Sequence, residues 1–190
     1  MAEQSDLLSD LDDLDFTRLL LADMHDDLHG KVSRFRHLED LVSTIGSRRS
    51  MIPGGEVAYT AWVEARSSFV HGNFLATVLL AQALAEQMLA AMLTLGLDAE
   101  SIPPKIDFRK TLKRCRARDM ISQRDADDLE RLMEMRNPLS HHRLINDPSN
   151  LSRRVIDERI SGEEHLCRDA TFAISMAVRL LALPMIRLGD

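Results

Sequence analysis

The longest apolar stretch of the sequence, residues 74–97, limits what this chain can fold into more than any other feature. It is long enough to cross a bilayer, but Gln82, Glu86 and Gln87 lie within it, and such polar groups are costly in hydrocarbon. A helix at the centre of a helical bundle accommodates the same pattern, because its polar residues can lie at the edge of the buried face. The sequence therefore predicts a long core helix over residues 74–95 and no membrane partner.

Composition and apolar spacing extend the helical prediction to the rest of the chain. Aromatic residues make up only 4% of the sequence, which favours helices over sheets. Apolar residues recur every three to four positions in most segments, and no alternating strand pattern is present. These features predict an all-α fold, an antiparallel helical bundle over residues 51–190 preceded by an N-terminal helical extension over residues 1–50.

The individual helices of the predicted bundle are marked by capping residues and turns. The helix before the short turn 71–73 should form an antiparallel hairpin with the long core helix. The apolar face of the helix before the turn is predicted from the spacing of Ala58, Ala61, Trp62, Ala65 and Phe69. Gly96 suits the C-terminal cap of that long helix. Residues 143–160 are predicted to be irregular. The residues that open the later helices are Asp107, the pair Ser122 and Asp125, and the pair Ser161 and Glu164.

The first thirty residues form a segment of unusual charge, with nine carboxylates against Arg18 as the only Lys or Arg. Their leucines recur at heptad-like spacing, which predicts an amphipathic helix that weakens at Gly30. Such an arm either packs on its own core or mediates dimerisation or partner binding. The leucines of this stripe are Leu7, Leu11, Leu14, Leu21 and Leu28.

The cellular compartment is predicted from the cysteines and the N-terminus. Cys115 and Cys167 have no CxxC spacing, and the acidic start of the chain lacks the basic-then-apolar pattern of a secretory signal. Both thiols are therefore expected to be reduced and in the core, as is usual for a cytoplasmic protein.

A polar motif follows the helix that Ser122 opens. Arg136 continues the apolar face of that helix, which directs a guanidinium toward the expected core. Pro138 should end the helix at Asn137, because proline lacks an N–H and disfavours helix in the residue before it. His141 then falls in a turn, and we expect Arg136 and His141 to share one pocket.

The order of these elements resembles the HEPN superfamily of helical-bundle proteins over about residues 56–187. A helix and tight turn lead into a long Ala-rich helix with an inner Glu, and an Arg-Asn-x-x-x-His motif precedes the final helix. The residues that carry the resemblance are Ala65, Phe69, Gly72, Ala76, Ala83, Glu86 and Leu89 in the hairpin, and Arg136, Asn137 and His141 in the motif.

The resemblance implies a dimeric, metal-independent endoribonuclease without a cofactor, in which two motifs form one composite site. His141 would transfer protons near neutral pH, and Arg136 would bind the charge that develops on the phosphate. Asn137 would position the phosphate or His141, and Glu86 would orient Arg136. The resemblance also implies a toxin or defence effector with an antitoxin or regulatory partner.

Structural roles explain the same residues without catalysis. Arg136 could pair with Glu86 or cap helix carbonyls, and His141 could satisfy backbone groups. The chain would then be a non-catalytic helical module that acts as a regulatory or protein-interaction subunit. Some toxin members of the superfamily carry a tyrosine two residues after the motif histidine, which a partner nucleotidyltransferase modifies. Arg143 occupies that position here, which argues against this form of control.

A basic segment precedes the motif in an otherwise acidic chain of net charge −6. Residues 105–124 hold eight Lys or Arg against two Asp, whereas residues 1–30 are strongly acidic. Cations near the motif predict a surface for RNA phosphate, although a charge run is also typical of a solvated face. The acidic arm could cover this segment and compete with RNA. The predicted RNA-binding residues are Arg109, Lys110, Lys113, Arg114 and Arg116.

Overall fold

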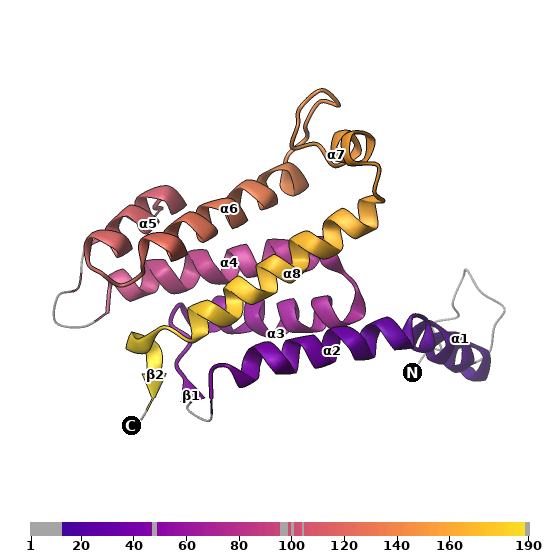
Figure 1. Ribbon diagram of the computed structural model, residues 1–190. Helices are drawn as coiled ribbons and strands as arrows, with labels where there is room; N and C mark the ends of the chain where they lie inside the picture. The colour runs from indigo at the N-terminus through magenta and orange to yellow at the C-terminus, as the bar shows by residue number, and fades with distance from the viewer. Residues whose placement is uncertain (1–12, 47–48, 96–98, 100, 104, 189–190) are drawn as a thin grey trace, which may run out of the picture.

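The computed structural model describes residues 13–46, 49–95, 99, 101–103 and 105–188. The regular secondary structure of this part of the chain is helical, apart from two strands of two residues each (Figure 1). The prediction of an all-α fold is therefore confirmed. The helices are α1 Asp13–His25, α2 Leu28–Ser43, α3 Gly55–His71, α4 Phe74–Leu93, α5 Phe108–Ala117, α6 Gln123–Ser140, α7 Leu151–Glu158 and α8 Gly162–Leu181. A 3-10 turn, Pro184–Ile186, precedes strand β2, Arg187–Leu188, which pairs with β1, Arg49–Ser50.

Helix α4 lies at the centre of the bundle and contacts α3, α5, α6 and α8 (Figure 1). Its apolar side chains are buried on several faces at once, as expected of a core helix. Among the described residues it is also the one helix long and apolar enough to cross a membrane by length and composition alone. Half of its most apolar window is buried inside the protein.

The α3–α4 hairpin turns at Gly72, which adopts a left-handed conformation (φ 82°) that glycine tolerates best. A second glycine, Gly54, has φ 104° and lies against α4. A Cβ there would come within 3.0 Å of the carbonyl of Gln87, so only glycine lets the start of α3 approach this closely. The predicted cap of α4, Gly96, lies outside the described residues.

The N-terminal segment breaks earlier than predicted, between His25 and Leu28 rather than at Gly30. Asp27 caps α2 from a left-handed conformation and accepts hydrogen bonds from the N–H of Gly30 and from Arg34. Arg34 also donates to the carbonyl of Val70 at 3.0 Å, which ties α2 to the end of α3. Helix α2 adds the buried Leu38 to the core, so the predicted extension is partly integrated with the bundle.

Helix α1 has no buried residue, and Figure 1 places it at the opposite end of the molecule from α5. The described part of the arm, from residue 13 on, therefore does not fold over the basic segment of the same chain. Two leucines of the predicted stripe, Leu7 and Leu11, lie outside the described residues. The large apolar side chains that α1 exposes are Leu14, Phe16, Leu19, Leu20, Leu21 and Met24.

Two predictions about the second half of the chain are wrong, and one short strand pair was not anticipated. Helix α6 continues through Pro138 to Ser140, because a proline in the last turn removes only one hydrogen bond and the N–H of His141 still bonds to the carbonyl of Asn137. Residues 151–158, predicted as irregular, form α7, which Asn150 caps. The β1–β2 pair escaped prediction because two-residue strands are too short to show alternation.

Candidate functional site

The motif residues occupy the C-terminal end of α6. Arg136 and Asn137 are half-buried in its last turns, and His141 is exposed as its C-terminal cap in an extended conformation. None of these three side chains makes a hydrogen bond or ion pair with the residues that the structure describes. The motif therefore lies outside the closed core and has no intramolecular partner to account for its polar groups.

The continuation of α6 changes the expected relation between Arg136 and His141. Five residues of α-helix rotate the chain by about 140° beyond a full turn, so α6 separates the two positions around its axis. Helix α6 therefore does not have the earlier end from which a shared pocket was expected, and a shared pocket for Arg136 and His141 stays a prediction.

An ordered turn follows the motif. Asn150 donates from its side chain to the carbonyl of Arg143 at 2.8 Å, closing the connection between α6 and α7. Asp147 accepts hydrogen bonds from the hydroxyl and the N–H of Ser149, and these bonds lower the pKa of Asp147 below its ordinary value. The main chain after His141 is thus held by local hydrogen bonds.

The inner carboxylate of α4 has a different partner from the one expected. Glu86 accepts a hydrogen bond from Gln82 one turn earlier, at 3.0 Å, and in the described part of the chain no hydrogen bond or ion pair joins it to Arg136. Gln82 is only 1% exposed and its amide oxygen has no hydrogen-bond partner there. The two polar residues of the core helix therefore satisfy each other in part.

The predicted RNA-binding cations of α5 divide into two groups. Arg109, Lys113 and Arg116 line a cleft between α5 and α6, whereas Lys110 and Arg114 do not. Buried side chains of α5, including Leu112 and Cys115, set this division because they fix which faces of the helix stay exposed. Only three of the five cations therefore belong to the cleft.

The pairing of the cleft's cations is uneven. Arg109 pairs with Glu130 at 2.8 Å and with Glu134 at 3.7 Å. Lys113 and Arg116 are exposed and form no hydrogen bond or ion pair with any residue for which the structure gives a position. Two of the three cations that line the cleft are thus free to bind a ligand.

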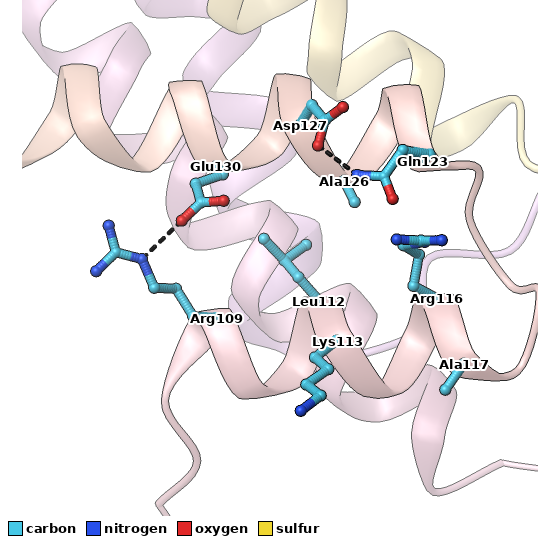
Figure 2. A pocket seen from close by; sticks show the side chains of 9 residues that line it. All are labelled: Arg109, Leu112, Lys113, Arg116, Ala117, Gln123, Ala126, Asp127 and Glu130. Atoms are coloured by element: carbon cyan, nitrogen blue, oxygen red, sulfur yellow. Dashed lines mark hydrogen bonds and ion pairs between the residues drawn. The ribbon is translucent and has the colours of Figure 1, made fainter.

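The α5–α6 cleft has a volume of about 400 Å³ (Figure 2). Figure 2 shows Arg116 extending from α5 toward Gln123 of α6, while the amine of Lys113 points away from α6. The cleft joins a cationic side from α5 to an acidic side from α6. The residues that line it are Arg109, Leu112, Lys113, Arg116, Ala117, Gln123, Ala126, Asp127 and Glu130.

Most carboxylates of α6 are already engaged. Arg179 of α8 pairs with Asp125 and, at 2.6 Å, with Asp128. Burial raises the pKa of Asp125, but hydrogen bonds from Ser122 and the charge of Arg179 outweigh this effect and lower it overall. Asp127 accepts a hydrogen bond only from the neutral Gln123, so its charge faces the cleft without a cationic partner among the described residues.

The cleft was not anticipated from the sequence, although its cations were. A spacing of three to four residues among Arg109, Lys113 and Arg116 indicates one helix face, and this signal was present. The acidic side comes from a different helix, so the pairing of the two sides depends on how α5 packs along α6.

Comparison of the chain with protein-family models, curated proteins and solved structures finds no match. The functional interpretation is therefore built from the residues and their geometry.

Proposed function

We propose that this protein is a metal-independent endoribonuclease of the HEPN type, with one composite site formed by Arg136, Asn137 and His141 of two copies. The observation that carries this proposal is the state of the motif: an Arg, an Asn and a His at one ordered helix end, outside the closed core and without partners among the described residues. Polar side chains that are removed from water for structural reasons usually have such partners, and the half-buried Arg136 and Asn137 have none among the described residues.

The chemistry matches the residue types. The 2′-oxygen of a ribose attacks the adjacent phosphorus, and the bond from phosphorus to the 5′-oxygen breaks. One His141 takes the proton of the 2′-hydroxyl, and a second His141 gives a proton to the leaving 5′-oxygen. Arg136 binds the negative charge on the phosphorane oxygens, and Asn137 donates a hydrogen bond to the same group. The products are a 2′,3′-cyclic phosphate and a 5′-hydroxyl.

A second copy provides what one chain lacks. The positions of Arg136 and His141 lie about 140° apart around the axis of α6, and a second helix end would supply groups on the other side of a bound phosphate. A two-fold axis beside the motif places both sets in a single cleft. The exposed apolar residues of α1 offer surface for such an assembly.

The test uses the full chain, purified and incubated with mixed RNA in an excess of chelator. The proposal expects cleavage that persists without divalent metal and leaves cyclic phosphate ends. RNA that stays intact, or cleavage that needs Mg²⁺, would contradict it.

A second candidate function is a non-catalytic helical module that acts through a protein partner, such as an antitoxin or a regulatory subunit. The absence of any buried residue in α1 favours it, because a helix of 13 residues is marginal in water unless its apolar side chains are covered. Intact RNA together with a stable complex through α1 would support this reading over the nuclease.

A further inference from the structure

The unpaired charges of the α5–α6 cleft favour a ligand with one negative group on the α5 side. Arg109 and Glu130 neutralise each other at one end of the cleft. Lys113 and Arg116 remain on the α5 side, and Asp127 remains on the α6 side. The cleft therefore carries one net positive charge, and a ligand with a single negative charge on its α5 side balances it.

The floor of the cleft is apolar. Leu112 is 5% exposed and Ala126 is 8% exposed, so each shows only a small apolar surface, between the charged side chains. Arg116 extends beside this region toward Gln123 and carries a planar guanidinium (Figure 2). Flat aromatic groups bind well between an apolar surface and an arginine plane, as nucleobases do in single-stranded RNA sites.

The dimensions and charges together define a class of ligand. A volume of about 400 Å³ lies within the usual range of small-molecule sites, roughly 300–1,000 Å³, and accommodates one nucleotide. A phosphodiester carries the single negative charge that the cleft needs. Asp127 and Glu130 repel a second phosphate on the α6 side, so the part of the ligand that meets them must be a hydrogen-bond donor.

We propose that the α5–α6 cleft binds one nucleotide of single-stranded RNA and selects adenine or cytosine over uracil, because these two bases carry an exocyclic amino group beside a ring nitrogen that accepts a hydrogen bond. Arg116 and Lys113 hold the phosphate, and the base lies against Leu112 and Ala126. Asp127 accepts a hydrogen bond from the amino group, and Gln123 beside it supplies an amide for the neighbouring ring nitrogen. Uracil presents a carbonyl oxygen at that position, which the carboxylate repels.

The cleft lies along α6 from the motif and so extends the proposed nuclease site. Nine residues of helix separate Asp127 from Arg136, a distance of about 14 Å along the axis. A strand with one nucleotide in the cleft can thus reach the motif with a nearby phosphate. The identification of the ligand as part of an RNA strand rests on the proposed function, whereas the base preference rests on the cleft alone.

The test measures binding separately from cleavage. Fluorescence anisotropy is recorded for the full-length protein with 2′-O-methyl oligonucleotides, which cannot be cut because the attacking 2′-hydroxyl is blocked. Oligomers of adenine and of cytosine should bind about tenfold more tightly than oligomers of uracil, as one charge-assisted hydrogen bond allows.

Two variants and one control assign the effect to the cleft. Arg116→Gln should weaken all three oligomers about five- to tenfold and lower the salt dependence by about one phosphate contact. Asp127→Asn should remove most of the preference for adenine and cytosine and leave uracil binding equal or tighter. Arg168→Gln, an exposed cation on α8, should change neither property beyond twofold.

The possible outcomes separate the cleft from the nuclease. Equal affinity for the three oligomers, or an Asp127→Asn variant that keeps the preference, overturns the cleft proposal even if cleavable RNA is cut. A base preference that Asp127→Asn removes supports the cleft even if cleavable RNA stays intact, and then only the nuclease proposal fails. No binding to any oligomer overturns the cleft proposal.

Discussion

Arg154 of α7 donates two hydrogen bonds to Asp169 of α8, at 2.7 Å and 3.1 Å. The Asp169 side chain is 6% exposed, so the guanidinium compensates a carboxylate that is almost fully removed from water. These hydrogen bonds raise the pKa of Arg154 above its ordinary value despite its partial burial. Asn150 caps α7 and also donates a hydrogen bond to the carbonyl of Arg143. Because the Arg154–Asp169 pair holds α7 against α8, it also stabilises the turn that follows His141.

Replacement of this arginine should destabilise the fold. Arg154→Gln leaves the buried Asp169 carboxylate without a cation, and the free energy of unfolding should fall by about 2–3 kcal/mol. The matched control is Arg153→Gln on the same helix, which removes an exposed pair with Asp157 and should cost at most about 0.5 kcal/mol. The two variants are compared by urea unfolding monitored with circular dichroism. Equal losses of unfolding free energy would show that the buried Arg154–Asp169 pair stabilises the fold no more than the exposed pair does.

Stability should fall in acid through Asp125. The folded state holds the pKa of this carboxyl below its ordinary value of 3.8, so the unfolded chain takes up the proton first as the pH falls. Its contribution is full well above pH 3.8 and disappears as the pH drops through the lower folded pKa. Asp125→Asn should therefore cost about 1–2 kcal/mol at pH 7 and progressively less below about pH 4.

Thermal unfolding from pH 7 to pH 3 measures this difference. Asp40→Asn serves as the control, since Asp40 is exposed and its side chain has no hydrogen bond or ion pair within the described part of the chain. If the difference in unfolding temperature between Asp125→Asn and the native protein stays constant with pH, the proposed coupling between Asp125 protonation and stability is ruled out.

Substitution of the proposed catalytic residues should abolish cleavage without unfolding the protein. His141→Ala and Arg136→Ala should each lower the cleavage rate by about a hundred- to ten-thousand-fold, the usual cost of losing a general acid–base or charge-stabilising group. Both side chains are at least partly exposed and unpaired among the described residues, so the unfolding temperature should stay near that of the native protein. His142→Ala is the neighbouring control and should retain most activity. An unchanged rate for His141→Ala would remove the mechanism.

Deletion of residues 1–26 tests the arm and removes from α2 only exposed hydrogen bonds, those that Asp27 and Lys31 make to residues 23–26. The cut keeps Asp27, which caps α2, and Leu38, which belongs to the core. Since α1 buries nothing in its own chain, the unfolding temperature should not fall, but the mass in solution should drop to that of a monomer if the arm joins two copies. Light scattering and RNA cleavage are recorded together. Loss of thermal stability with no change in mass would mean that the arm supports its own chain.

Local sequence rules identified much of the helical framework. Ser122 with Asp125 forms the predicted capping box, and Asp107 and Ser161 cap α5 and α8 as expected, because these contacts join residues only two or three positions apart. The apolar face of α3 was equally readable from spacing alone. Its predicted residues, Ala58, Ala61, Trp62, Ala65 and Phe69, are all buried.

Tertiary packing decided the features that bear most on the candidate site. The sequence by itself determined that α5 carries cations on one face and that Arg136 and His141 lie five residues apart. Only the packing of α5 along α6 set Arg116 opposite Asp127, and only the docking of α7 on α8 brought Arg154 to Asp169. Such pairs depend on which apolar faces meet in the core, and that choice is made by the whole chain rather than by spacing within one helix.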